Sequence, residues 1–157
     1  MSPACCWRAG PSYGLRVTEA APTETELPRI GGFDALLGMR LDEAGPDEVL
    51  TSVEITPELL QPYGILHGGV LCSMVETTGS VAAALWYGDR GHVVGTANHT
   101  NFLRAAREGT LTARATPVHR GRTQQLWNID ITDAAGRLIA KGELRVANLS
   151  SADALGR

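Results

Sequence analysis

The chain has 157 residues, a length that predicts one domain, and 43% of these residues are hydrophobic while 20% are charged. This apolar fraction excludes a chain that is disordered throughout. The formal net charge of −3 at pH 7 argues against a general nucleic-acid-binding protein. The longest weakly polar stretch, residues 64–87, contains a histidine, two serines and a glutamate, so we expect no membrane span.

The cysteines and the N-terminal segment predict a reducing compartment. Cys5 and Cys6 are adjacent and Cys72 stands alone, a spacing that fits neither a disulfide framework nor a zinc site. The N-terminal segment contains no continuous apolar run of signal-peptide length. We therefore expect a cytoplasmic protein.

The first third of the chain predicts an extension, a short helix and a hairpin. Residues 1–28 show neither helical nor strand periodicity and are expected to be a poorly ordered extension. Residues 31–38 have the pattern of a short helix closed by glycine. Residues 39–44 and 48–55 alternate apolar and polar positions on either side of a Gly-Pro-Asp turn, which predicts a β-hairpin.

One long helix is predicted over residues 67–85, after a loop that contains two prolines. Its apolar residues recur at helical spacing over about five turns. Four strands are expected after it, over residues 92–102, 110–119, 123–132 and 138–146. Hairpins in series with one inserted helix predict an α+β domain over residues 29–148, in which an antiparallel sheet curls around the helix. Residues 149–157 are expected to be a frayed tail.

Two glycines, Gly68 and Gly69, open the predicted helix directly after His67. A helix N-terminus offers backbone N–H groups without intrahelical partners, and glycine lets a ligand approach the backbone closely. Such a place can hold an oxyanion or a polarised carbonyl group. A tight turn from loop to helix is the simpler interpretation of the same residues.

Glu76 lies two turns further along, where a buried acid without a partner would cost free energy. It belongs to a stripe of small or polar residues spaced by three or four: Gly69, Ser73, Glu76, Ser80 and Ala83. The stripe could be a solvent-facing side, but Glu76 is its only charge, which favours a functional acid.

The spacing of Gly68 and Glu76 constrains how the two residues can act together. They are eight residues apart, or about 12 Å along a helix that rises 1.5 Å per residue. One small reacting group cannot touch both on the same helix. If both act on one carbonyl group, they come from two copies of the chain with antiparallel helices. The spacing therefore predicts an obligate dimer with sites at the interface.

The segment QPYGILHGGV at residues 61–70, followed by Glu76, resembles the hotdog-fold acyl-CoA thioesterases, in particular the PaaI-like and the glutamate-using 4-hydroxybenzoyl-CoA types. Three later segments resemble the family's third strand and turn, its next hairpin and its last strand: residues 101–109, 118–123 and 136–140. The resemblance covers about residues 31–146. It implies a hotdog fold and a homodimer or dimer of dimers.

The resemblance also implies a role for each residue of the motif. Gly68 would donate its backbone N–H to the thioester oxygen, and Glu76 of the partner chain would be the nucleophile or the general base. Gln61 would position the thioester or the water, and His67 would shape the start of the helix. Ser80 would hydrogen-bond near Glu76. The expected reaction is hydrolysis of an acyl-CoA to free acid and CoA, without a metal or a separate cofactor.

Arginines concentrate in the second half of the chain, where residues 99–129 hold five arginines against one glutamate. This pattern suggests either a local anion site or arginines that decorate exposed strand faces. The family holds the phosphates of CoA with basic residues and backbone groups. The resemblance therefore implies these CoA-binding candidates: Arg104, Arg120, Arg122 and Gly69, with Arg107 behind them.

Several alternatives remain at this point. A non-catalytic hotdog protein that senses acyl-CoA stays open, as does a scaffold with a decayed site, although Glu76 and Gln61 weigh against both. Cys72 and His67 lie on different helix faces, which disfavours a cysteine nucleophile. In relatives with an additional histidine on the third strand, the matching position here is Phe102, which leaves the acyl-chain preference open.

Overall fold

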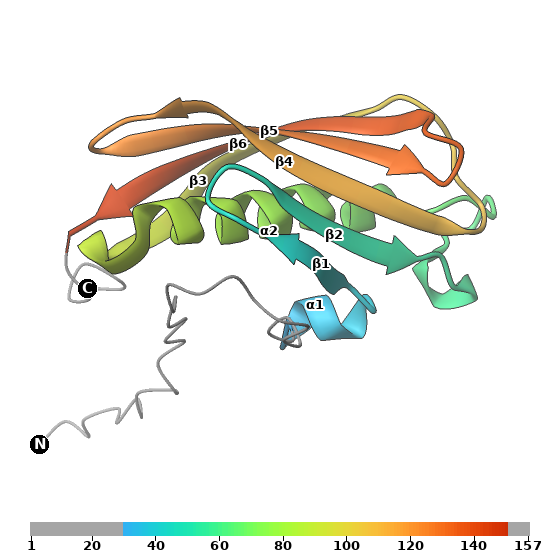
Figure 1. The fold of residues 1–157 in the computed structure, drawn as a ribbon. Coiled ribbons are helices and arrows are strands. Elements are labelled where there is room, and N and C mark those ends of the chain that lie inside the picture. Colours follow the sequence, from blue (N-terminus) through green and yellow to red (C-terminus); the bar gives the residue numbers. More distant parts are fainter. Residues whose placement is uncertain (1–29, 151–157) are drawn as a thin grey trace, which may run out of the picture.

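A six-stranded antiparallel sheet curves around one long helix in the computed structural model, which describes residues 30–150 (Figure 1). The strand order is β1-β2-β4-β5-β6-β3, so β1 and β3 form the two edges. The elements are α1 (Phe33–Leu36), β1 (Arg40–Ala44), β2 (Val49–Glu54), η1 (Pro57–Leu59), α2 (Gly68–Tyr87), η2 (Gly88–Arg90), β3 (His92–Phe102), β4 (Thr110–Arg120), β5 (Gln124–Asp133) and β6 (Leu138–Leu149).

This arrangement confirms the predicted α+β fold with a sheet around a central helix. Element boundaries agree with the prediction to within three residues, and the largest difference is at β6, which continues to Leu149 instead of ending at Val146. The reason is pairing at long range, because Leu149 lies opposite His92 on β3. The predicted N-terminal extension, Cys5, Cys6 and most of the predicted tail lie outside the described residues.

The core lies between α2 and the concave face of the sheet. The helix supplies buried Val70, Met74 and Val75, while the largest fully buried side chain of the sheet is Trp127 on β5. Gly142 on β6 faces the helix, and a Cβ atom there would lie 2.4 Å from Cγ2 of Val75. Glycine at this position therefore lets α2 approach the sheet closely, which fixes the height of the helix above the strands.

The helix is also long and apolar enough to cross a membrane if only length and composition are considered. The segment Gly68–Arg90 reaches a mean hydropathy of 1.2, so its few polar residues do not exclude a span by themselves. In the structure, its apolar side chains are instead buried in the core or partly buried against it. The packing identifies α2 as the core helix of a folded domain.

Candidate active site

The loop between β2 and α2 places Gln61 next to the start of the helix. Gln61 N–H donates to the Ile65 carbonyl at 2.8 Å, which closes the loop on itself. His67 N–H donates to the Leu59 carbonyl at 2.9 Å, and Leu66 N–H donates to the Ala106 carbonyl at 2.8 Å. These bonds hold the loop against the turn that follows β3, so that Gln61 and Gly68 line one cavity.

His67 is the N-cap of α2, as its predicted role at the helix start requires. Its Nδ1 atom accepts a hydrogen bond from the Gly69 backbone N–H at 2.9 Å. The neighbouring Gly68 N–H has no acceptor among residues 30–150. The imidazole therefore accepts from one of the backbone N–H groups that have no partner within the helix. The Gly68 N–H stays available to a ligand oxygen.

A cavity of about 210 Å³ lies in front of this free N–H group. Its wall is largely apolar, with Gln61 and Arg104 as the polar exceptions. The lining residues are Gln61, Ile65, Leu66, Gly68, Leu71, Phe102, Leu103, Arg104, Ala105 and Ala106. An apolar cavity with a few convergent polar groups is typical of a small-molecule site.

Phe102, the last residue of β3, lies against Gly68. A Cβ atom on Gly68 would come within 2.9 Å of the ring carbon Cζ of Phe102, so a larger residue at position 68 would displace the ring. Phe102 is 57% exposed in a single chain. Phe102 thus forms an aromatic wall beside Gly68.

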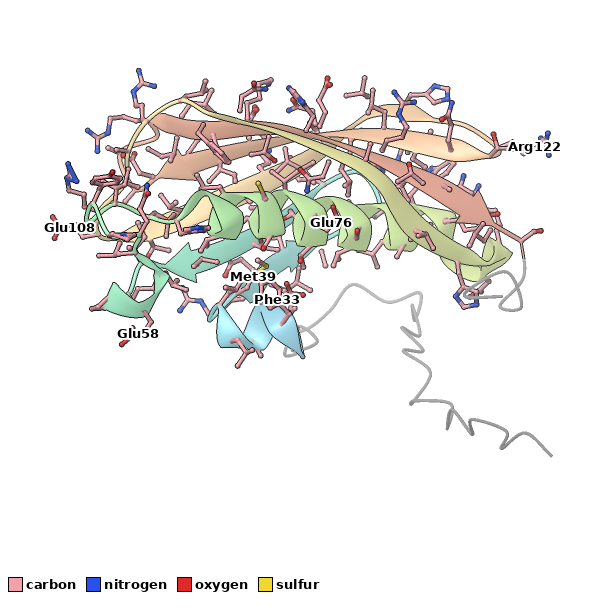
Figure 2. The ribbon with its side chains drawn as sticks, turned by 180° about the vertical axis from the view of Figure 1, so that it is seen from behind. Phe33, Met39, Glu58, Glu76, Glu108 and Arg122 are labelled. Carbon is pink, nitrogen blue, oxygen red and sulfur yellow. The ribbon has the colours of Figure 1, made fainter. Side chains whose placement is uncertain are left out.

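Glu76 lies in the middle of α2 (Figure 2) and does not line this cavity. Its Oε2 atom accepts a hydrogen bond from Nδ2 of Asn98 on β3 at 3.0 Å. The same amide nitrogen donates to the Cys72 carbonyl at 3.0 Å, and Thr100 Oγ1 donates to Asn98 Oδ1 at 2.7 Å. The sequence analysis missed Asn98, because only the register of β3 against α2 shows which of its polar residues meets Glu76.

Two other residues of the predicted site form no hydrogen bond with the Glu76 side chain in this structure. Ser80 lies one turn after Glu76, half-buried, and no hydrogen bond joins their side chains. Gly69 has its N–H bound to His67, and its carbonyl accepts from Ser73 Oγ at 2.8 Å. The predicted roles of Ser80 near the acid and of the Gly69 backbone at CoA therefore stay predictions.

The predicted CoA-binding arginines do not form one cluster within a chain. Arg104 lies beside the cavity, and its backbone N–H donates to the carbonyl of Ile139 on β6 at 3.1 Å. Arg120 lies opposite Gln125 on β5, and Gln125 in turn lies opposite Val146 on β6. The two positions are separated by seven residues of β6, or about 24 Å along a strand. In Figure 2, Arg122 lies at the end of the molecule opposite to Glu108.

The arginines also differ in their partners. Arg120 forms an ion pair with Asp47 at 2.7 Å and lies over the ring of Trp86, with its Cζ atom 5.5 Å from the ring centre. Arg104 and Arg107 donate instead to backbone carbonyls, at 2.9 Å and 3.4 Å. The positive charges near the cavity are therefore those of Arg104 and Arg107, while the charge of Arg120 is balanced by an aspartate.

Comparison with known proteins shows the family to which this chain belongs. The sequence model of the Thioesterase superfamily matches residues 63–140. The 1,4-dihydroxy-2-naphthoyl-CoA hydrolase of Escherichia coli is 34% identical over 119 residues, which cover 76% of this chain and 88% of that protein. The chain belongs to the thioesterase superfamily.

Two solved structures of this superfamily's fold extend the comparison. The crystal structure of AziG from S. sahachiroi is 48% identical, with a TM-score of 0.76, and the match covers 78% of this chain and 99% of that one. The PaaI protein of the Escherichia coli phenylacetic acid degradation operon is 21% identical and shares the fold, with a TM-score of 0.69 over 75% of this chain and 86% of that one. The predicted hotdog fold is confirmed, and the protein is a thioester hydrolase.

Proposed function

We propose that this thioesterase hydrolyses acyl-CoA in a site shared by two copies of the chain. The observation that carries the proposal is the free Gly68 N–H at the wall of an apolar cavity that also contains Gln61. An acyl group would fill the cavity, and its thioester oxygen would accept the Gly68 hydrogen bond. Negative charge develops on this oxygen during hydrolysis, and a donor fixed at a helix N-terminus stabilises it.

The carboxylate of the reaction would come from the second copy. No acidic side chain among residues 30–150 lines the cavity, and Glu76 lies about 12 Å further along the same helix. Two antiparallel α2 helices would bring Glu76 of one copy next to Gly68 of the other. This arrangement supplies each cavity with the acid that its own chain cannot provide.

The free edge of the sheet supports this pairing of two copies. β3 has 11 residues and pairs only with β6 among the strands that the structure describes. Most of its residues are exposed, including Val94 and Phe102. A long exposed edge strand is a ready template for another strand, and two-fold symmetry would place two β3 strands side by side. A further association into a dimer of dimers stays a prediction from the family resemblance.

Glu76 would act in one of two ways at the thioester carbon. As a general base, it takes a proton from water, the hydroxide attacks the carbonyl carbon, the C–S bond breaks and the CoA thiolate takes up the proton. As a nucleophile, it forms a mixed anhydride and expels the thiolate, and water then cleaves the anhydride. Gln61 would hold the thioester or the water in either route.

Arg104 and Arg107 are the arginines placed to meet the phosphates of CoA at this cavity. Both lie on the turn that follows β3, where Arg104 also forms part of the cavity wall. Arg120 and Arg122, at the other end of the sheet, would reach the same CoA only from another copy. Guanidinium groups bind phosphate in bidentate geometry, which suits this role.

The test is release of free CoA thiol from short, long and aromatic acyl-CoAs by the wild type and by Glu76→Gln. We expect turnover by the wild type and a loss of roughly a thousandfold or more in kcat for the variant, with acyl-CoA binding retained. Glu143→Gln, an exposed glutamate on β6, serves as the matched control and should behave as the wild type.

Two results would contradict the proposal. Undiminished hydrolysis by Glu76→Gln would remove the glutamate mechanism. Binding of acyl-CoA by the wild type without turnover of any thioester in the panel would point to a sensor and not to an acyl-CoA hydrolase.

A further inference from the structure

We infer that Asn98 and Thr100 on β3 orient the Glu76 carboxylate, so that Oε2 is anchored and Oε1 is the oxygen that acts on the substrate. The inference rests on the proposed function of Glu76 and assigns positioning roles to residues outside the helix motif. It also assigns different tasks to the two oxygens of the carboxylate.

The Asn98 amide binds α2 at two points one turn apart. Its nitrogen has two hydrogens, and its two acceptors, Glu76 Oε2 and the Cys72 carbonyl oxygen, both lie at 3.0 Å. Cys72 is four residues before Glu76 on the helix, so the amide spans the turn that carries the acid. A donor tied to the helix backbone as well as to the carboxylate fixes Oε2 relative to the helix itself.

Thr100 determines which end of the Asn98 amide faces the acid. The threonine hydroxyl donates to Asn98 Oδ1 at 2.7 Å, and this oxygen can only accept. Residues 98 and 100 share one face of the strand, the face turned toward α2. The hydroxyl thereby keeps the amide oxygen away from the carboxylate and the amide nitrogen toward it.

Gly95 leaves the space that the second carboxylate oxygen needs. A Cβ atom on Gly95 would lie 2.3 Å from Glu76 Oε1, so any other residue here would push this oxygen aside. No side chain among residues 30–150 donates a hydrogen bond to Oε1. The carboxylate is thus held by one oxygen and free at the other.

This asymmetry suits either route of the proposed reaction. Oε1 takes the proton from water or forms the bond to the carbonyl carbon, while Oε2 keeps its hydrogen bond to Asn98. Without that bond the side chain would sample several rotamers, and the reactive geometry would be populated for a smaller fraction of the time. Asn98 is exposed in a single chain, and the second copy required by the proposed function would cover this strand.

The test compares Asn98→Asp, Asn98→Ala and Gly95→Ala with the wild type. The aspartate keeps the shape of asparagine but replaces the donor with a second carboxylate that repels Glu76 at 3.0 Å, whereas the alanine removes the donor without adding a charge. For the Asn98 variants we expect kcat to fall roughly 10- to 100-fold, the range for a lost hydrogen bond to a charged group, while KM stays within about twofold. Gly95→Ala should also lower kcat, because its methyl group displaces Oε1. Thr100→Val should give a smaller fall of the same kind.

Asn101→Ala is the matched control. Asn101 lies on the same strand, exposed and on the opposite face, so its kcat and KM should equal those of the wild type. Thermal unfolding of every variant is followed in parallel. Melting temperatures that remain near the wild-type value in Asn98→Asp and Thr100→Val show that a lower kcat does not reflect unfolding.

The Glu76→Gln background separates this inference from the proposed function. If Asn98 acts through Glu76, adding Asn98→Ala to Glu76→Gln lowers the residual rate no further. Wild-type kcat in both Asn98 variants, with Glu76→Gln inactive, overturns the positioning role and leaves the proposed function intact. If Asn98→Ala lowers the rate of Glu76→Gln by the same factor as it lowers the rate of the wild type, the positioning role is overturned as well. Full activity of Glu76→Gln itself would instead remove the proposed function.

Discussion

Phe102 lies against Gly68 and lines the same cavity. Its ring lies against Gly68 and cannot donate a hydrogen bond, so it can contribute only apolar contact with the substrate. The ring face and the leucines of the cavity wall together form a surface for the acyl group. An apolar contact of this kind is formed in the ground state and in the transition state alike, so it acts on binding.

We therefore expect Phe102→Ala to raise KM for acyl-CoA by about 3- to 10-fold, the range for one lost aromatic contact, with kcat within about threefold of the wild type. Steady-state thiol release measures both constants. Val118→Ala, an exposed apolar residue on β4, is the control and should change neither. An unchanged KM for Phe102→Ala would show that the acyl group does not lie on the ring.

The site residues that the sequence predicts are those whose relation is fixed by local geometry. His67, Gly68 and Glu76 lie on one helix, where 1.5 Å per residue sets their separation before any fold is known. Asn98 could not be found in this way, because its bond to Glu76 joins residues 22 positions apart. The positions of the arginines in space depend on the fold for a related reason: the hairpin that carries Arg120 and Arg122 lies at the end of the sheet away from the cavity, and their role at CoA stays a prediction.

Among the elements, α2 and β6 depend on each other at one close contact. Gly142 leaves room for Val75, which is fully buried, and Ile129, opposite Gly142 on β5, is fully buried as well. An overpacked core forces side chains off their rotamers or shifts the backbone. Any movement of α2 at this point would also move Glu76, the next residue on the helix.

Gly142→Ala should therefore lower the free energy of unfolding by about 1 to 3 kcal/mol. Urea denaturation monitored by circular dichroism measures the change. Glu143→Ala, the exposed neighbour on the same strand, should stay within about 0.5 kcal/mol of the wild type. Equal stabilities of the two variants would show that a methyl group fits between α2 and β6 at this contact without strain.

Periodicity predicted every helix and strand of residues 30–150 except the two short 3-10 turns at Pro57–Leu59 and Gly88–Arg90. Helical spacing of apolar residues and the turn residues between strands are local signals, and they were sufficient for the element order. The end of β6 was missed because Leu149 becomes strand only by pairing with His92, far away in the sequence. Strand order and register likewise depend on contacts that no local pattern contains.

For the whole molecule, the proposed function divides each site between two copies of the chain. The start of α2 holds the cavity and the free N–H, and in the proposed dimer the middle of the same helix would supply the acid for the other copy's cavity. The exposed edge at β3 offers the surface on which a second copy would complete both sites. The proposed chemistry therefore depends on association, and a monomer would be inactive although fully folded.

Mixing two inactive variants tests this account most directly. Gln61→Ala impairs the cavity half, and Glu76→Gln removes the acid half. In a mixed dimer one site carries both defects and the other carries neither, so equal amounts of the two chains, assembled together at random, should restore about a quarter of the wild-type rate. Rates that stay at the level of the separate variants, with mixed dimers demonstrated by mass spectrometry, would contradict a site shared between two copies.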